Sequence, residues 1–357
     1  MSTVGLALWD EKGQRDLVKD LRSLIAIIKK EQKKMVAKSY NLDLLAGLEL
    51  QVEGIYSSSN PGDSAKWPSL DYNQDDFLGH FFNKLKLLTV HAPCSGKNIA
   101  SFDDAERRWS IDETNHAMDF TYKIGGSSLI LHPGSVLSWG DFTKDRRNQT
   151  EDKFYESFKD LAKHYFEKGY DGRNPEGKSL SLGIENMDPP HLIMTRREHE
   201  RVFNRCLDIM LDSSGGRSRD EIMDKSLKMR VDFSHYWNSH ITLKENPDKG
   251  FVEGYSEIVC NDVIKYMENL VRENYRKIEG FHMAGCYNNT TRRSRITHGA
   301  IMPIPRIYSR DELNLERVLN IPGVLDKNII LEVFIGDFKS LIFSHQNVID
   351  YIKSRRK

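Results

Sequence analysis

Short apolar segments alternate with longer amphipathic segments along the whole of this 357-residue chain. The apolar segments have the length of strands, and their continuous apolar character is typical of strands buried on both faces of a parallel sheet. Eight such strands are predicted, at residues 4–9, 47–52, 87–91, 128–132, 180–186, 229–233, 278–283 and 328–334.

The segments between the strands carry apolar residues at helical spacing. Four of them show one apolar face each, formed by Leu17, Leu21, Leu24 and Ile28; by Phe154, Phe158, Leu161 and Tyr165; by Val202, Cys206, Ile209 and Met210; and by Val259, Val263, Tyr266, Met267 and Leu270. Eight strand-helix units predict an α/β fold of the (β/α)8 TIM-barrel type. An open doubly wound sheet is the alternative, but no glycine-rich phosphate fingerprint follows the first strand.

The length suits one TIM-barrel domain over residues 1–357. Segments near 57–73 and 212–224 are rich in Ser, Gly, Asp and Pro and are interpreted as loop insertions at the barrel ends, where they would shape access to a site. A third insertion is expected near residues 284–310.

The balance of charge narrows the range of partners. Lys plus Arg and Asp plus Glu both number 52, so no global basic field favours nucleic acid or membrane binding, and such a partner would need a local patch. The four cysteines lie far apart without a CxxC pair, which argues against a disulfide framework and indicates a cytoplasmic protein. No uncharged stretch approaches the roughly 18 residues of a membrane span. No protein partner is inferred.

Potential metal ligands stand at the ends of six predicted strands: His91, His132, Glu185, Asp232, His282 and Glu332. Because the carboxyl ends of barrel strands share one face, these six side chains are expected to converge. His235 follows Asp232 closely enough for a turn to bring it to the same rim, and His298 lies in the segment after the seventh strand. Imidazoles mixed with carboxylates suit zinc, manganese, iron or cobalt.

These motifs resemble the xylose isomerase-like barrel superfamily, and within it the endonuclease IV family (AP endonuclease family 2) of zinc-dependent abasic-site nucleases. The matching stretches are His91-Ala92-Pro93 with Asn98-Ile99-Ala100, Leu131-His132-Pro133-Gly134-Ser135, Ile184-Glu185-Asn186, Asp232-Phe233-Ser234-His235, Phe281-His282-Met283 and Leu331-Glu332. The second of these is the most specific. The resemblance covers essentially the whole barrel.

The resemblance implies a divalent metal, zinc first and manganese or cobalt as alternatives. One ion would be held by His91, His132 and Glu185, with Glu185 bridging to a second ion. The second ion would be completed by Asp232, His282 and Glu332. A third site in the family uses the histidine equivalent to His235 with an Asp-x-His pair; His298 can supply that histidine, but Ile296 stands where the aspartate should be.

Two further departures bear on the substrate. Cys94 replaces the family's aromatic residue after His-Ala-Pro, and the seventh strand is followed by a stretch without the family's Asn-Asp-rich signature. Residues 280–310 contain no Asp or Glu, yet they include Arg292, Arg293 and Arg295 close to His298. Our hypothesis is that these arginines grip an anionic substrate group, phosphate above all; a solvated basic loop is the competing interpretation.

Two enzyme classes follow. In the first, a multinuclear site activates a hydroxide for attack on a phosphodiester, at abasic sites in DNA or in a related phosphoester. In the second, one metal serves a sugar or sugar-phosphate isomerase or epimerase, in which Glu185 and Glu332 transfer protons and His235 orients a substrate oxygen. The pair His91 and His132 favours the hydrolase. A barrel that keeps a metal without turnover is the third and weakest interpretation.

Overall fold

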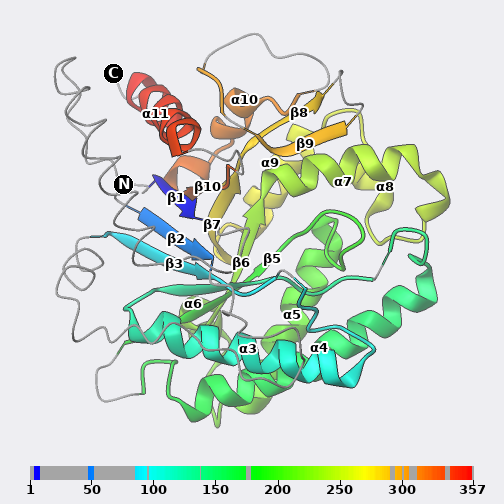
Figure 1. Ribbon diagram of the computed structural model, residues 1–357, viewed down its shortest axis with the longest axis vertical. Helices are drawn as coiled ribbons and strands as arrows, with labels where there is room; N and C mark the ends of the chain where they lie inside the picture. The colour runs from blue at the N-terminus through cyan, green and yellow to red at the C-terminus, as the bar shows by residue number, and fades with distance from the viewer. Residues whose placement is uncertain are drawn as a thin grey trace.

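In the computed structural model, eight parallel strands close into a barrel (Figure 1). It describes residues 4–8, 47–51, 85–94, 96–136, 138–173, 178–289, 294–299, 301–304, 312–333 and 338–355. The barrel strands are β1 (Val4–Leu8), β2 (Gly47–Gln51), β3 (Leu87–His91), β4 (Ser128–Leu131), β5 (Ser181–Glu185), β6 (Leu227–Asp232), β7 (Ile278–Met283) and β10 (Asn328–Leu331). Strands adjacent in this order pair with each other, and β10 closes the barrel against β1. All eight predicted strands are confirmed, and the open sheet is excluded.

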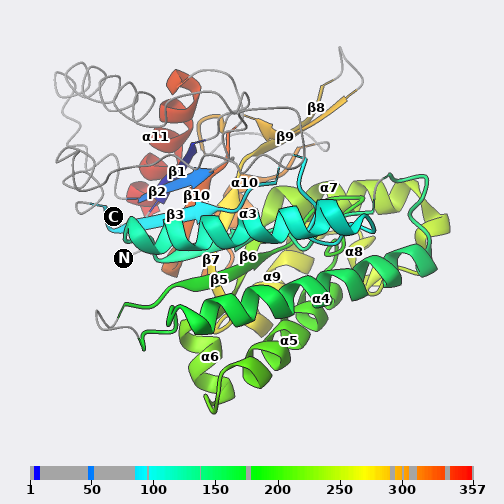
Figure 2. The ribbon, with the colours of Figure 1, turned by 60° about the horizontal axis from the view of Figure 1, so that its bottom comes forward.

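Helices cover the outside of the barrel (Figure 2). Those in the described residues are α3 (Asp104–Lys123), α4 (Lys144–Glu167), α5 (Arg196–Ser213), α6 (Arg219–Lys225), α7 (Phe233–Glu245), α8 (Tyr255–Ile258), α9 (Val263–Asn274), α10 (Leu315–Leu319) and α11 (Phe338–Arg355). None of these helices has both the length and the apolar character needed to cross a membrane.

Two of the helical faces predicted from the sequence pack inward as predicted, and a third does so in part. Phe154, Phe158, Leu161 and Tyr165 of α4 are fully buried, and the rings of Phe154 and Phe158 lie 5.8 Å apart. The α5 face at residues 202–210 is likewise in the core, where α5 packs against α4. On α9 the side chains of Tyr266, Met267 and Leu270 are buried, and Val263 is partly buried. Val259, predicted on the same helical face, caps the separate helix α8. The predicted helical face at 17–28 lies outside the described residues.

The predicted loop insertions differ from what the structure shows. Segment 212–224 is largely helical, because α5 runs to Ser213 and α6 begins at Arg219 after a capping box on Ser218. It leads into the amino end of β6, so it lies at the end of the barrel away from the strand ends predicted to carry the site, and it cannot shape access to them. Segment 284–310 contains an antiparallel hairpin, β8 (Gly285–Asn289) and β9 (Ser294–Gly299), which packs against α7. Segment 57–73 lies outside the described residues.

The barrel lumen holds charge beneath its carboxyl face. Because side chains alternate along a strand, residues two positions before the site residues also face inward. One of them is Arg230, which is fully buried, with Nη2 3.5 Å from Oε2 of Glu279. Gly280 makes room for this guanidinium, since a Cβ there would lie 2.6 Å from Nη1 of Arg230.

Candidate metal centre

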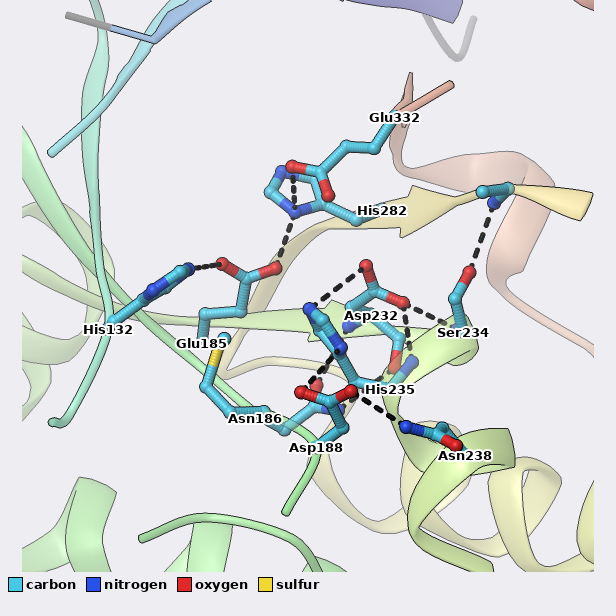
Figure 3. A network of polar contacts seen from close by, with 12 residues as sticks. His132, Glu185, Asn186, Asp188, Asp232, Ser234, His235, Asn238, His282 and Glu332 are labelled. Carbon is cyan, nitrogen blue, oxygen red and sulfur yellow. Dashed lines mark hydrogen bonds and ion pairs between the residues drawn. The ribbon is translucent and has the colours of Figure 1, made fainter. Parts of the chain in front are cut away.

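All six candidate ligands predicted from the sequence meet at the carboxyl face of the barrel. Figure 3 shows His132, Glu185, Asp232, His282 and Glu332. His91, Glu185 and Asp232 are the last residues of β3, β5 and β6, and His282 lies in β7. His132 and Glu332 come directly after β4 and β10. Five of the six are buried, whereas the His132 side chain keeps 21% of its surface exposed. Among the described residues, the site therefore opens on the side of His132, which lines a pocket.

Glu185 lies at the centre of this group, and its two oxygens face different partners. Oε2 is 3.3 Å from Nε2 of His91 and 3.3 Å from Nε2 of His132. Oε1 is 2.5 Å from Nδ1 of His282, and the same nitrogen is 3.0 Å from Oε1 of Glu332. A carboxylate placed in this way has the geometry to bridge two ions.

The start of α7 fixes Asp232 and His235 together. Oδ1 of Asp232 accepts hydrogen bonds from the backbone N–H groups of Ser234 and His235, at 2.5 and 2.9 Å, and so caps the helix. This leaves Oδ2 facing Nε2 of His235 at 3.7 Å. Asn186 holds the base of this turn, because its side chain donates to the Asp232 carbonyl at 2.9 Å and accepts from the Asp232 N–H at 2.8 Å. Phe233 therefore begins a helix and does not continue the strand as predicted.

The two loop signatures are tied to each other by Asn98. Its side chain donates to the carbonyl of Ser135 at 2.9 Å and accepts from the N–H groups of Ala100 at 3.0 Å and Ser135 at 3.2 Å. Gly134 lies against this contact with φ +90°, and a Cβ there would be 2.5 Å from Cβ of Ala100. Glycine is required on both counts, conformation and space. The loop after β3 thus sets the position of the loop that carries His132.

The electrostatics of the histidine pair differ from one ring to the other. Burial alone would lower the pKa of His91, but its hydrogen bond with Glu185 and the charges of Glu185, Glu49 and Glu332 raise that pKa to about 9. Burial and the nearby His91 lower the pKa of His132 to about 4, against the effect of Glu185. The rings lie edge to face with centroids 4.5 Å apart. Near neutral pH the pair therefore carries one positive charge, on His91, while His132 is neutral.

His282 carries the other buried positive charge of the metal-free centre. Burial opposes its ionisation, but Glu332, Glu49 and Glu185 together raise its pKa well above the usual value. The pKa of Glu185 is correspondingly held well below its ordinary range, since His282, His132 and His91 outweigh the effect of burial. A divalent cation would take over the role of these protons, because metal ligands bind as neutral imidazole and as carboxylate.

The ligand set predicted from the sequence did not include Glu49, Asp188 and His191, although Glu49 could be interpreted as a rim carboxylate near the second strand. Glu49 is in the middle of β2 and contacts Nε2 of His282 at 3.0 Å. Asp188, in the loop after β5, lies 3.7 Å from Nδ1 of His235 and 3.8 Å from Nδ1 of His191. The signal for Glu49 was its place between Leu48 and Leu50 in a strand, which points its side chain into the lumen.

The arginines of the basic segment are not placed at the centre by the structure. Arg292 and Arg293 fall outside the described residues. Arg295 and His298 lie on β9, where Arg295 pairs with Asn288, but their side chains are outside the described part of the chain. Away from the centre, the ring of His199 is buried between the Ile184 carbonyl at 2.9 Å and the Tyr236 hydroxyl at 3.0 Å.

The residues present fit a divalent metal. Three groups of ligand atoms lie within 4.8 Å of one another among the described residues: His91, His132 and Glu185; Glu185, Asp232, His235 and Glu332; and Glu49, His282 and Glu332. Mixed imidazole and carboxylate donors of this kind suit zinc and the other divalent transition metals.

Comparison with known proteins agrees with this architecture. Residues 61–310 match the family described as xylose isomerase-like TIM barrel. The chain belongs to this family. The chain is also 20% identical to an uncharacterized protein of Methanocaldococcus jannaschii. The match extends over 202 residues, which are 57% of this chain and 71% of the relative.

Solved structures with the same fold include nucleases and sugar epimerases. Endonuclease IV from Thermus thermophilus superposes with a TM-score of 0.54 at 13% identity, covering 99% of each chain. An L-ribulose 3-epimerase has a TM-score of 0.54 at 12% identity, and the match covers 99% of this chain and 94% of the epimerase. A D-psicose 3-epimerase gives 0.54 at 11% identity, with coverage of 99% and 98%. At these identities the likeness is one of fold.

Proposed function

We propose that this protein is a metal-dependent hydrolase of phosphoesters, with zinc bound at two adjacent positions that share Glu185. The observation that carries the proposal is the convergence of both early histidines on one Glu185 oxygen, at 3.3 Å each, while the other oxygen faces His282. A mononuclear centre built on His282, Asp232 and the two glutamates does not need His91 and His132.

His91, His132 and Glu185 would hold the first metal, and Glu185, Asp232, His282 and Glu332 the second. Bound there, the ions would lower the pKa of water and stabilise the charge that develops on the phosphoryl oxygens. The protein itself contributes by holding the metal-binding side chains in place. Asp232 is fixed by its capping hydrogen bonds, and His91 is fixed because its Nδ1–H donates to the Ala92 carbonyl at 2.9 Å.

The space next to His132 suits a small anionic group. A pocket of about 90 Å³ opens beside it and includes Lys97, Ser135 and His191 in its lining. The ammonium group of Lys97 lies 4.7 Å from the centroid of the Trp109 ring, in a cation–π contact. A lysine and a serine in the lining of a pocket beside a metal centre are suited to a phosphate. The arginines at 292, 293 and 295 would add to this charge as the hairpin's contribution.

The abasic-site nuclease is the specific form of this proposal, and it has a direct test. Purified protein is analysed for metal, then incubated with a duplex that carries one abasic site and, separately, with a simple aryl phosphodiester. We expect about two zinc ions per chain and cleavage of at least the phosphodiester. Cleavage of both substrates supports the nuclease, and cleavage of only the small ester supports a related phosphoesterase. A full metal complement without any cleavage contradicts the hydrolase.

The variant His132→Asn separates the two enzyme classes, with His116→Asn as its control because His116 is on the exposed side of α3. We expect His132→Asn to lose one metal and hydrolysis together, and His116→Asn to lose neither.

A sugar isomerase or epimerase is the second candidate, supported by the closeness of Glu185, Asp232, His235 and Glu332, whose ligand atoms lie within 4.8 Å of one another. Glu185 and Glu332 would then move protons, and His235 would orient a substrate oxygen. One bound ion per chain and a His132→Asn variant with unchanged metal content favour this candidate.

The basic hairpin is tested separately, through Arg293→Ala and Arg295→Ala. We expect each to weaken the affinity for inorganic phosphate or a phosphorylated ligand, and unchanged binding of anions contradicts the assignment.

A further inference from the structure

The two ring nitrogens of His282 meet different carboxylates. Nδ1 faces the central group, 2.5 Å from Oε1 of Glu185 and 3.0 Å from Oε1 of Glu332. Nε2 faces the opposite side of the lumen, 3.0 Å from Oε1 and 3.2 Å from Oε2 of Glu49. His282 and Glu49 are both buried, with 0% and 1% of their surface exposed.

We propose that Glu49 is a positioning residue, which accepts a hydrogen bond from Nε2–H of His282 and so leaves Nδ1 as the nitrogen that binds metal. The inference rests on the metal centre of the proposed function. A neutral imidazole carries one proton, and the partner of one nitrogen decides which nitrogen is left with its lone pair. Metal-binding histidines commonly give their other N–H to a carboxylate in this way.

The surroundings of Glu49 favour this role over that of a direct ligand. Thr89 of β3 donates a hydrogen bond from Oγ1 to Oε2 of Glu49 at 2.8 Å, so the carboxylate is held from the neighbouring strand. An ion placed between Glu49 and Nε2 would bind the side of His282 that faces away from Glu185. Glu185 and Glu332 both contact Nδ1 of His282. An ion bound at Nδ1 can therefore contact His282, Glu185 and Glu332 together, whereas an ion at Nε2 cannot.

A chain of hydrogen bonds therefore connects Thr89 of β3 through Glu49 of β2 to His282 of β7. Strands β2 and β7 are not neighbours in the barrel, so the Glu49–His282 contact spans the lumen. A hydrogen bond of this kind fixes the rotation of the His282 ring before any ion arrives.

The test is the zinc affinity of purified, metal-free protein, measured by competition with a chromophoric chelator. Glu49→Leu removes both the charge and the acceptor, and we expect zinc to bind about 10- to 100-fold more weakly. Glu49→Gln keeps an oxygen that can accept from Nε2–H, and we expect an affinity between those of Glu49→Leu and wild type. Glu113→Gln, a buried glutamate on α3, is the matched control and leaves the affinity unchanged.

Two readouts separate positioning from structure or direct ligation. The visible absorption spectrum of the Co²⁺-loaded protein should change in intensity in Glu49→Leu and return towards wild type in Glu49→Gln, while the number of bound ions stays the same. Loss of one whole ion in Glu49→Gln makes Glu49 a ligand and overturns the inference. Equal affinity in wild type and Glu49→Leu overturns it as well. A wild-type protein that binds no zinc or cobalt overturns the proposed metal centre, and the inference with it.

Discussion

Oε1 of Glu185 lies 2.5 Å from Nδ1 of His282, whereas the other oxygen of the same carboxylate faces His91 and His132. One side chain at the end of β5 thus links residues contributed by β3, by β7 and by the loop after β4.

The first prediction concerns this shared position. Glu185→Gln replaces a bridging carboxylate with a neutral amide, so both ions lose a ligand at once. We expect the metal content to fall from about two ions per chain to less than one, as measured by elemental analysis after dialysis. Glu113→Gln serves as the control. A variant that keeps one firmly bound ion would show that the two positions do not share Glu185.

The second prediction is a pH dependence of the metal-free protein. Burial lowers the pKa of His91, but Glu185 and its neighbours raise it from 6.5 to about 9, so the folded state binds this proton more tightly than the unfolded state. The stabilising contribution is complete below pH 6.5 and is lost as the pH rises through 9. A shift of this size corresponds to about 3 kcal/mol.

Urea unfolding in the presence of a chelator at pH 6, 7.5 and 9 measures this loss. We expect His91→Asn to show a shallower decline over that window than wild type. The decline does not vanish, because His282 also has a raised pKa. Parallel declines in the two proteins would mean that His91 is not the group that titrates.

The third prediction concerns Gly134, where φ is +90° and a Cβ would meet Ala100 at 2.5 Å and Oδ1 of Asn98 at 2.8 Å. Gly134→Ala strains the backbone and displaces the loop that carries His132. We expect a loss of roughly 1–3 kcal/mol in the free energy of unfolding, together with weaker zinc binding. Gly216→Ala is the matched control: φ is +104° there and nothing lies within 4 Å of the Cβ, so it should cost stability without changing zinc binding. Equal zinc affinity in both variants would separate the loop from the metal centre.

The sequence predicted the barrel well because its signals are local. Each barrel strand is a short apolar run, and six runs end in a side chain that can bind metal, so topology alone brings those side chains together. Glu49 could be interpreted only as a possible rim carboxylate, because it lies in the middle of a strand rather than at its end. Contacts across the lumen of the barrel depend on strand register. Asp188 and His191 were not predicted as site residues, because the loop after β5 has no periodic pattern. Asp188 lies 3.7 Å from His235. In the resemblance, the histidine at this position shares a third metal site with an aspartate, and Ile296 stands in place of that aspartate in this chain.

The last prediction concerns the charge beneath the centre. Arg230 is fully buried in the lumen, two residues before Asp232, and lies 3.5 Å from Glu279. Glu279 in turn accepts hydrogen bonds from Ser128 at 2.9 Å and Ser181 at 3.2 Å. Arg230 also lowers the pKa of Glu49, together with the larger effect of His282 and against the effect of burial. The guanidinium is therefore a buried counter-charge for carboxylates above and below it.

Arg230→Met removes that cation at similar length and leaves the carboxylates uncompensated, which costs about 3–5 kcal/mol when one partner of a buried pair is lost. The double variant Arg230→Met with Glu279→Gln should recover part of this loss, because the uncompensated charge at Glu279 is gone. Denaturant unfolding of wild type, both single variants and the double variant gives the coupling energy directly. A coupling energy of zero would show that Arg230 is retained for Glu49 and the metal centre rather than for Glu279, in which case the stability lost in Arg230→Met should return when zinc is added.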